Sequence, residues 1–372
     1  MKDKIIAFVK KETVLTIAWI LAVISAFFIK PGIDYIGYID FRSLGILWSL
    51  MIIMQGLSKM GFFDAIGQKL LSKTKRIYQL IAVLVFLCFF LSMFITNDVA
   101  LITFVPFALF ILKECNKENL FIPVIVLETL AANLGSMLTP IGNPQNLYLF
   151  GLSKLPLTDF IFIMLPYTLA TFVLLCVSIF FIKGKEEKII INNQKVVHLT
   201  SKKMVIMYAI LFLISLLVVA RVLDYYYLVA LVLIIVFIFD KKTLISIDYA
   251  LLFTFIGFFI FTGNLGNINA VKDVLTNLIK GNEVLMGVLS SQIISNVPAA
   301  LLLSPFTNNY KDLIIGVNLG GLGTLIASMA SLISFKTLAH NYNELKGKYF
   351  IAFTIMNIVY LLILLGLWMI IR

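Results

Sequence analysis

The sequence has few charged residues, histidines and cysteines for its length. Only 13% of its 372 residues are Asp, Glu, Lys or Arg, against about a quarter in soluble proteins. The three cysteines and two histidines lie apart without metal-ligand or redox spacing, so neither a disulfide framework nor a zinc site is predicted. Walker A, HExxH and GxSxG patterns are also missing from the sequence. We therefore expect no enzyme and no cofactor.

Hydrophobic residues, in contrast, make up 61% of the chain, and its mean hydropathy is +1.04. No soluble core of this length could bury so much apolar surface, so lipid must cover a large part of it. The composition excludes a soluble enzyme, a nucleic-acid binder and a secreted module. With roughly 20 residues per crossing, we predict an all-α polytopic membrane protein with about nine full spans.

Positive charge predicts the orientation of these spans. We assume a cytoplasmic N-terminus and two interrupted runs that return to the side from which they enter. The cytoplasmic segments then hold 22 of the 30 Lys and Arg residues, and the outer segments hold eight. Because Lys and Arg are enriched in cytoplasmic loops, we expect a multi-pass protein of the plasma membrane with its N-terminus in the cytoplasm and its C-terminus outside.

Interruptions in the apolar runs indicate where a site is to be expected. The run 78–112 breaks at 96–98 (Thr-Asn-Asp), and the run 283–306 breaks at 295–298 (Ser-Asn-Val-Pro). A further stretch, 133–146, contains two prolines and two glycines. Backbone exposed at membrane depth is tolerated only where protein or a water-filled cavity covers it. We therefore predict two discontinuous helices and interpret the runs 78–112 and 283–306 as re-entrant hairpins, while two full spans in either run would leave the sides of the loops unchanged.

The two halves of the sequence repeat these features. Asn97 in the first broken run corresponds to Asn296 in the second, and residues 133–139 match residues 318–324 in register. The first copy enters the membrane from outside and the second from the cytoplasm, so we predict inverted repeats. The predicted parts are an N-terminal helix with the first repeat in 1–182, a cytoplasmic linker in 183–203, and an extra helix with the second repeat in 204–372.

Polar residues at the breaks are the candidates for solute binding. The N-terminal end of a half-helix suits an anion, whereas the carbonyls at a C-terminal end suit Na⁺. Asparagine both donates and accepts, so Asn97 and Asn296 can bridge a solute and a nearby Na⁺. An alternative is that such residues only cap helices and join them. The predicted substrate-binding residues are Thr96, Asn97, Ser136, Thr139, Asn143, Asn146, Ser295, Asn296, Thr324 and Ser328, and Ser331 supplies a further neutral polar group at the site.

Two acidic residues lie in apolar surroundings and are candidates for ion coupling. An acid inside a membrane span is costly and by default indicates function. Asp98 and Glu128, with Gly142 and Gly323 at the breaks, are predicted to couple transport to Na⁺ or H⁺. The alternatives are that Asp98 caps the returning half of its hairpin and that Glu128 is a protonated or hydrogen-bonded packing residue.

These motifs resemble the ion transporter superfamily with the citrate-transporter-like fold. The resemblance rests on 96–98 and 133–144 and covers roughly residues 40–370. The superfamily includes divalent-anion/sodium symporters, arsenite/antimonite efflux permeases and a class of Na⁺/H⁺ antiporters. Membership implies a scaffold part, a transport part that moves like an elevator, and often a homodimer.

The chain departs from the dicarboxylate symporters of that superfamily, which resemble each other in a Ser-Asn-Thr signature at both hairpin tips. Here the tips read Thr-Asn-Asp at 96–98 and Ser-Asn-Val at 295–297. An ionised Asp98 repels a carboxylate unless it is protonated or bound to a cation. An Asn-Asp pair at this place looks more like the arsenite permeases, whose substrate is neutral or weakly acidic.

The sequence therefore predicts a secondary active transporter. It moves a small anion, a carboxylate or similar, or a weakly acidic solute across the plasma membrane by alternating access, coupled to Na⁺ or H⁺. Arsenite/antimonite efflux and Na⁺/H⁺ antiport are alternatives within transport, and a non-transporting membrane scaffold or receptor is the alternative from another class. The expected partners are the solute, membrane lipid and a second copy in a homodimer, and not nucleic acid.

Overall fold

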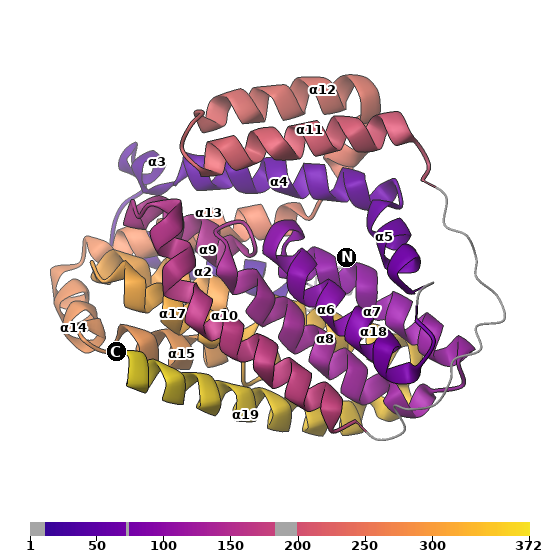
Figure 1. The fold of residues 1–372 in the computed structure, drawn as a ribbon. Coiled ribbons are helices and arrows are strands. Elements are labelled where there is room, and N and C mark those ends of the chain that lie inside the picture. The colour runs from indigo at the N-terminus through magenta and orange to yellow at the C-terminus, as the bar shows by residue number, and fades with distance from the viewer. Residues whose placement is uncertain (1–11, 72–73, 183–198) are drawn as a thin grey trace, which may run out of the picture.

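The computed structural model describes residues 12–71, 74–182 and 199–372, and the elements within these ranges are helical (Figure 1). Seven helices there, two of them with adjoining turns, are long and apolar enough to cross a membrane. They are α4 (Phe41–Lys59), α6 (Ile77–Ile95), α8 (Phe121–Gly135), α10 (Leu157–Phe180), α11 (Lys202–Val219), α13 (Tyr249–Gly266) and α19 (Lys346–Ile371). The prediction of an all-α, multi-pass membrane protein is confirmed.

Seven spans are fewer than the nine expected, because two apolar segments form shorter or irregular helices. In the first, α2 (Thr13–Ala26), the helix has 14 residues. The second, α12 (Tyr225–Ser246), bends at Asp240, whose φ of −152° and ψ of 57° are non-helical. The Asp240 carboxylate accepts hydrogen bonds from the hydroxyls of Tyr208 at 2.9 Å and Thr243 at 2.7 Å. These bonds hold the bend in place.

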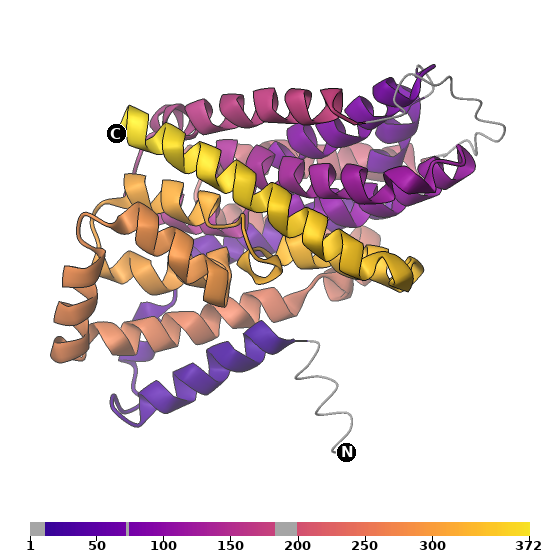
Figure 2. The ribbon, with the colours of Figure 1, turned by 90° about the horizontal axis from the view of Figure 1, so that it is seen from below.

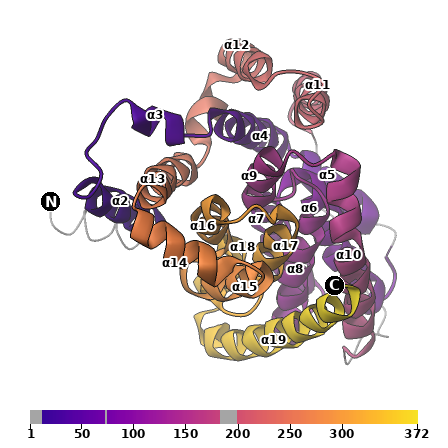
Figure 3. The same cartoon turned by 90° about the vertical axis from the view of Figure 1, so that its left-hand side faces the viewer.

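Six helices form an arc along one side of the molecule, which we call the outer arc (Figures 1 and 3). It consists of α2, α3 (Asp34–Tyr38), α4, α11, α12 and α13. Within the arc, α11 and α12 pack on α4, and α2 packs along α13. Each of these contacts joins segments that are far apart in the sequence.

The other helices form an inner bundle against the arc (Figure 3). Seen from below, α10 and α19 lie side by side across one face of this bundle (Figure 2). The remaining bundle helices are α5 (Phe62–Leu71), α6, α7 (Asn97–Glu114), α8, α9 (Pro144–Ser153), α14 (Asn269–Ile279), α15 (Glu283–Ile294), α16 (Asn296–Leu303), α17 (Tyr310–Leu319) and α18 (Met329–Asn341).

Helix α19 illustrates how a helix that is apolar on every side acquires a packing face. Its buried residues recur every three or four positions, as one stripe requires. They are Tyr349, Phe353, Asn357, Tyr360, Leu364 and Trp368. Ile351, Ile355 and Leu362 lie off this stripe and are 57–63% exposed, so lipid is their expected environment.

Helical structure is interrupted at the places that the sequence predicts. At Thr96 α6 gives way to α7, and at Ser295 α15 gives way to α16; the two helices of each pair pack against each other. Residues 136–143 separate α8 from α9, and residues 320–328 separate α17 from α18. All four interruptions lie in the inner bundle, and they bring polar residues into its interior.

The predicted linker 183–203 falls outside the described residues up to position 198, as do residues 1–11 of the N-terminal part. Position 199 onward is described. There the N–H of Thr200 donates to the carbonyl of Met60 at 3.2 Å. This bond ties the beginning of α11 to the end of α4.

Candidate functional site

Two residues take a strained backbone conformation at the junctions inside the bundle. Thr96, between α6 and α7, has a φ of 70° and a ψ of 150°. Ser295, between α15 and α16, has a φ of 73° and a ψ of 155°. Residues other than glycine rarely enter this region, and holding them there costs about 1–3 kcal/mol each. Because such strain clusters at functional sites, the two junctions mark the candidate site.

Amides and hydroxyls connect the first junction to the broken helices. The side-chain carbonyl of Asn133 accepts hydrogen bonds from Asn97 Nδ2 at 3.1 Å and from Ser328 Oγ at 3.0 Å. Asn133 Nδ2 donates to Ser331 Oγ at 3.1 Å. These four side chains are at most 6% exposed. Their bonds fix the last turn of α8 to the beginning of α18.

The connection continues through Ser136 to Asn318. Ser136 Oγ donates to the backbone carbonyl of Asn133 at 2.8 Å and accepts from Asn143 Nδ2 at 3.2 Å. Asn143 Nδ2 also donates to Asn318 Oδ1 at 3.1 Å, and Asn318 Nδ2 donates to Asn146 Oδ1 at 2.6 Å. The last turn of α17 is thereby fixed to the beginning of α9. We call the following eight residues the asparagine network: Asn97, Asn133, Ser136, Asn143, Asn146, Asn318, Ser328 and Ser331.

Hydrogen bonds join the first junction to the break after α8. The N–H of Asn97 donates to the carbonyl of Gly142 at 3.1 Å, and Thr139 Oγ1 donates to the carbonyl of Met93 in α6. Gly142 leaves no room for a side chain, since an added Cβ would lie 2.0 Å from the carbonyl oxygen of Ser136. The close packing around Gly142 therefore depends on glycine.

The second junction is more open. Ser295 Oγ donates to the carbonyl of Ala327 at 3.5 Å. Asn296 is 5% exposed, and its amide makes no hydrogen bond with any residue that the structure describes. Thr324 is exposed and lies apart from the asparagine network, and its hydroxyl donates to the carbonyl of Gln292 at 3.2 Å. Asn296 therefore offers a free amide at the second junction.

Asp98 lies beside the network without being part of it. Its N–H donates to Asn97 Oδ1 at 3.0 Å. The N-cap of α7 is Thr96, so Asp98 does not cap this helix. Within the described ranges its half-buried carboxylate makes no hydrogen bond. Asp98 thus has an unengaged carboxylate one residue from Asn97.

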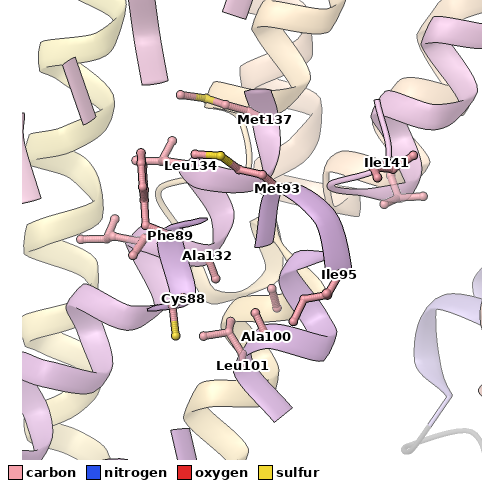
Figure 4. Close-up of a cluster of buried hydrophobic side chains, with 14 of the residues drawn as sticks. Cys88, Phe89, Met93, Ile95, Ala100, Leu101, Ala132, Leu134, Met137 and Ile141 are labelled. Atoms are coloured by element: carbon pink, nitrogen blue, oxygen red, sulfur yellow. The ribbon is translucent and has the colours of Figure 1, made fainter. Parts of the chain in front are cut away.

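Glu128 is fully buried in α8, and both of its carboxylate oxygens lack a partner among the described residues. It lies close to Cys88 of α6, which is surrounded by apolar side chains (Figure 4). The network instead continues from Asn133 of α8 toward α18. An ionised carboxylate without partners in such surroundings is costly. Glu128 is therefore a candidate for carrying a proton, and not for contacting a solute held by the network.

The site is electrically neutral apart from Asp98. The network contains neither Lys nor Arg, and the described part of the chain has no cluster of three or more His, Cys, Asp or Glu that could hold a metal ion. The helices α7, α9, α16 and α18 all begin at the junctions and breaks. Their N-terminal ends carry partial positive charge and suit an anion.

Three residues of this region were not among the predicted site residues. Asn133 and Asn318 begin the two matching stretches of the sequence, and this shared position was a signal that could have identified them. Gln292 had no such signal, because it lies within an ordinary apolar helix. Its contacts with residues 320–324 depend on the fold alone.

The chain is similar in sequence to known membrane proteins. Residues 3–311 match the model of a family described as citrate transporter. An uncharacterized transporter of Methanocaldococcus jannaschii is 36% identical over 332 residues, which cover 88% of this chain and 89% of the relative. The inner membrane protein YbiR of Escherichia coli is 32% identical over 313 residues, 80% of each chain. The silicon efflux transporter LSI3 of Oryza sativa subsp. japonica is 31% identical over 137 residues, 37% of this chain and 28% of the relative.

Proposed function

The chain belongs to the citrate transporter family, and we propose that within it the protein is a secondary active transporter that moves a small anionic or weakly acidic solute by alternating access. The family and the similarity to an archaeal transporter over most of the chain make it a membrane transporter and not an enzyme. The observation that carries the proposal is a repeated pattern of hydrogen bonds, in which Asn133 and Asn318 each bond to matching positions of the other half.

These two asparagines occupy matching positions of the two halves, 185 residues apart. Each bonds to the same two positions of the other half, Asn133 to Ser328 and Ser331, and Asn318 to Asn143 and Asn146. Such reciprocal contacts are those that an approximate two-fold axis produces. Together with the sides of entry predicted from the charges, they support inverted repeats around a central site.

Other contacts repeat in the same way. Thr139 and Thr324, also 185 residues apart, donate to carbonyls of α6 and α15 respectively. Asp40 and Asp248 cap α4 and α13 with nearly the same backbone angles, φ −80° with ψ 85° or 88°. The long helices that precede these caps, α2 and α12, pack on the capped helix of the other half, since α2 packs on α13 and α12 packs on α4. These matches support α6–α7 and α15–α16 as the two re-entrant hairpins of the repeats.

The solute binds between the two junctions. Helix N-termini and neutral amides attract an anion there without a fixed cation, which favours weak and reversible binding. Asn296 has the free amide and is the first ligand, and Thr96, Ser295 and the hydroxyls of the network are the further candidate ligands. Because Asn97 is already bonded to Asn133, it positions the network and reaches the solute only when that bond opens.

Asp98 couples the solute to a cation. Its carboxylate repels an anion until Na⁺ or H⁺ neutralises it, so each ligand strengthens binding of the other. The carbonyl of Gly142 and the side-chain oxygen of Asn97 are oxygen ligands of the kind that suits Na⁺. Glu128 is a second titratable group, and we assign it the role of carrying a proton.

Efflux of a weakly acidic solute such as arsenite is the second candidate function. Asp98 disfavours a dicarboxylate, whereas a solute that is neutral near pH 7 meets no such repulsion. The relative from rice is named for silicon efflux, which favours the outward direction.

During transport the inner bundle moves relative to the outer arc. The outer arc is the scaffold, which includes the interface of a homodimer, and the inner bundle carries the solute across the plasma membrane. The N-terminus lies in the cytoplasm and the C-terminus outside, as the distribution of Lys and Arg favours.

Uptake into proteoliposomes tests the proposal. Labelled citrate, succinate and arsenite are each offered with a Na⁺ gradient, a proton gradient or neither. We expect gradient-driven movement of one of them, lost in Asn296→Ala with an unchanged Tm, because this side chain makes no bond that folding requires. Asn341→Ala on the exposed side of α18 is the control, with wild-type transport.

Wild-type uptake in Asn296→Ala would remove this residue from the site. Movement of arsenite alone would favour efflux permeases. If no solute moves while an internal pH dye reports cation–proton exchange, the anion proposal is wrong and Asp98 and Glu128 serve an antiporter.

A further inference from the structure

An arginine of the outer arc binds the end of a helix in the inner bundle. Arg221 lies in the turn between α11 and α12, and its Nη2 donates to the carbonyl of Phe150 in α9 at 2.8 Å. Its guanidinium carbon also lies 4.8 Å from the centre of the Phe150 ring. Carbonyls in the last turn of a helix lack helical partners and carry partial negative charge, so a cation suits this position. This contact joins the arc to the bundle.

The backbone of Arg221 supports a role for its side chain. Arg221 has a φ of 64° and follows the end of α11, where glycine is the usual residue in this left-handed conformation. Glycine would adopt the conformation without strain but could not reach Phe150. Asp224 of the same turn bonds instead to the hydroxyl of Tyr226, at 2.9 Å. The turn therefore keeps a strained residue at the position that binds α9.

Two further contacts fix the end of α9 to the arc (Figure 3). An added Cβ at Gly151 would lie 3.2 Å from Ser43 Oγ in the first turn of α4, so the backbone of α9 packs closely on that turn. One turn earlier, the ring of Tyr148 lies 5.5 Å from the ring of Phe259 in α13. The end of α9 thus contacts three parts of the arc, namely the α11–α12 turn, α4 and α13.

The corresponding helix of the second half lacks such contacts. Helix α18 follows the second break as α9 follows the first, and an approximate two-fold relation of the halves would place it against α13. In the described part of the chain, however, α9 packs on α4, whereas α18 has no comparable packing on α13. Likewise, α16 packs on α13 more extensively than α7 packs on α4. The bundle and the arc are therefore in closer contact around α9 and α16 than around α7 and α18.

The predicted orientation assigns these contacts to the two sides of the membrane. The distribution of Lys and Arg places the segments that follow α9 and α16 outside, and those that follow α7 and α18 in the cytoplasm. The gap between arc and bundle is thus closed toward the outside and less closed toward the cytoplasm.

We propose that Arg221 is a positioning residue that holds α9 against the outer arc in the inward-facing state of the transport cycle. The inference rests on the proposed transport function and assigns this structure to one of its states. For the solute to reach the outside, α9 must leave the arc, and the bond between Arg221 and Phe150 must break. A hydrogen bond from a charged donor shifts the ratio of two such states by about tenfold.

Labelling of a covered residue measures how often α9 leaves the arc. Ser43 is 3% exposed and lies against the end of α9, and Ser43→Cys places a thiol there with little change in size. In a chain whose three native cysteines are replaced by alanine, a maleimide reaches this thiol only while α9 is away from the arc. The labelling rate of the purified protein in detergent therefore reports the fraction of molecules in which the contact is open.

We expect Arg221→Gln to raise the labelling rate about tenfold. Lys154→Gln is the matched control with an unchanged rate, because it removes a positive charge just after α9 and its side chain makes no hydrogen bond with a described residue. A rate in Arg221→Gln equal to that of the control would overturn the inference. If Ser43→Cys does not fold, Gly151→Cys in α9 reports the same opening and the same comparison applies.

Ser43→Cys combined with Gly151→Cys tests the assigned state. A sulfur in place of Ser43 Oγ lies within bonding reach of a second sulfur on the new Cβ. We expect an oxidant to form this disulfide and to stop gradient-driven transport, which a reductant restores, while each single variant transports normally under the oxidant. Failure of the disulfide to form, or undiminished transport by the cross-linked protein, would contradict an inward-facing state held at α9.

Failure of the proposed function has a different readout, namely unimpaired transport by Asn296→Ala. Because labelling of Ser43→Cys requires no solute, the two results are distinguishable.

Discussion

Asn318→Ala removes the central bonds between the two halves. The Asn318 side chain accepts from Asn143 and donates to Asn146 and to the carbonyl of Ile314. At about 1 kcal/mol for each buried hydrogen bond, these three contribute about 3 kcal/mol, and leaving the buried Asn146 oxygen unpaired costs a further ~1–3 kcal/mol. Allowing for relaxation, the free energy of unfolding should fall by about 3–5 kcal/mol, a large part of the 5–15 kcal/mol that is typical in total.

The assay is thermal unfolding of the purified protein in detergent. Since 1 kcal/mol moves the Tm of a 150–250-residue domain by about 2–4 °C, we expect a loss on the order of 10 °C. Asn133→Ala should lose a similar amount, because Asn133 also makes three side-chain bonds. Asn341→Ala is the matched control, since its amide donates only to the carbonyl of Thr337 on an exposed turn. Its stability should change by no more than about 0.5 kcal/mol.

An Asn318→Ala protein that melts with the Asn341→Ala control would refute the reasoning, because the network would then contribute nothing to joining the halves. Loss of transport with an unchanged Tm would show that Asn318 acts on the solute.

Three further substitutions test separate parts of the site. Gly142→Ala should lower Tm and abolish transport, because the new Cβ meets the Ser136 carbonyl at 2.0 Å; a normal Tm would contradict the close packing. Thr96→Gly should raise the free energy of unfolding by about 1 kcal/mol, because relief of ~1–3 kcal/mol of backbone strain exceeds the ~0.5–1 kcal/mol entropy cost of glycine. The same substitution should slow transport. A lower Tm would mean that Thr96 is not strained. Glu128→Gln should remove the pH dependence of transport measured in proteoliposomes and leave solute binding intact, and a retained pH profile would assign the proton to another group.

The helix breaks are predictable because they depend on local chemistry. Prolines, glycines and polar residues inside an apolar run are visible without a fold, and the structure ends its helices there. The partners of Asn318 are not predictable in this way. Asn143 and Asn146 are 175 and 172 residues away, and the contact exists only because α17 packs on α9.

Two other features also depend on tertiary contacts. The bend at Asp240 is held by Tyr208 of another helix, so the sequence of α12 alone does not predict it. Gln292 is a single polar residue on α15, and nothing local distinguishes it from a side chain that merely bonds to its own helix. Its bonds to another segment form only once the loop at 320–324 is in place.

Because helices of the outer arc pack on partners from the other half of the chain, these contacts form late in biosynthesis. Helix α2 leaves the ribosome more than 200 residues before α13, on which it packs. At about 5–20 residues per second, α2 waits in the bilayer on the order of tens of seconds. Helix α4 waits in the same way for α11 and α12. In a nascent chain arrested after the first half, α2 and α4 therefore expose to lipid the surfaces that later pack on the second half. Quality-control factors that recognise unpacked helices can bind these surfaces until the second half is synthesised.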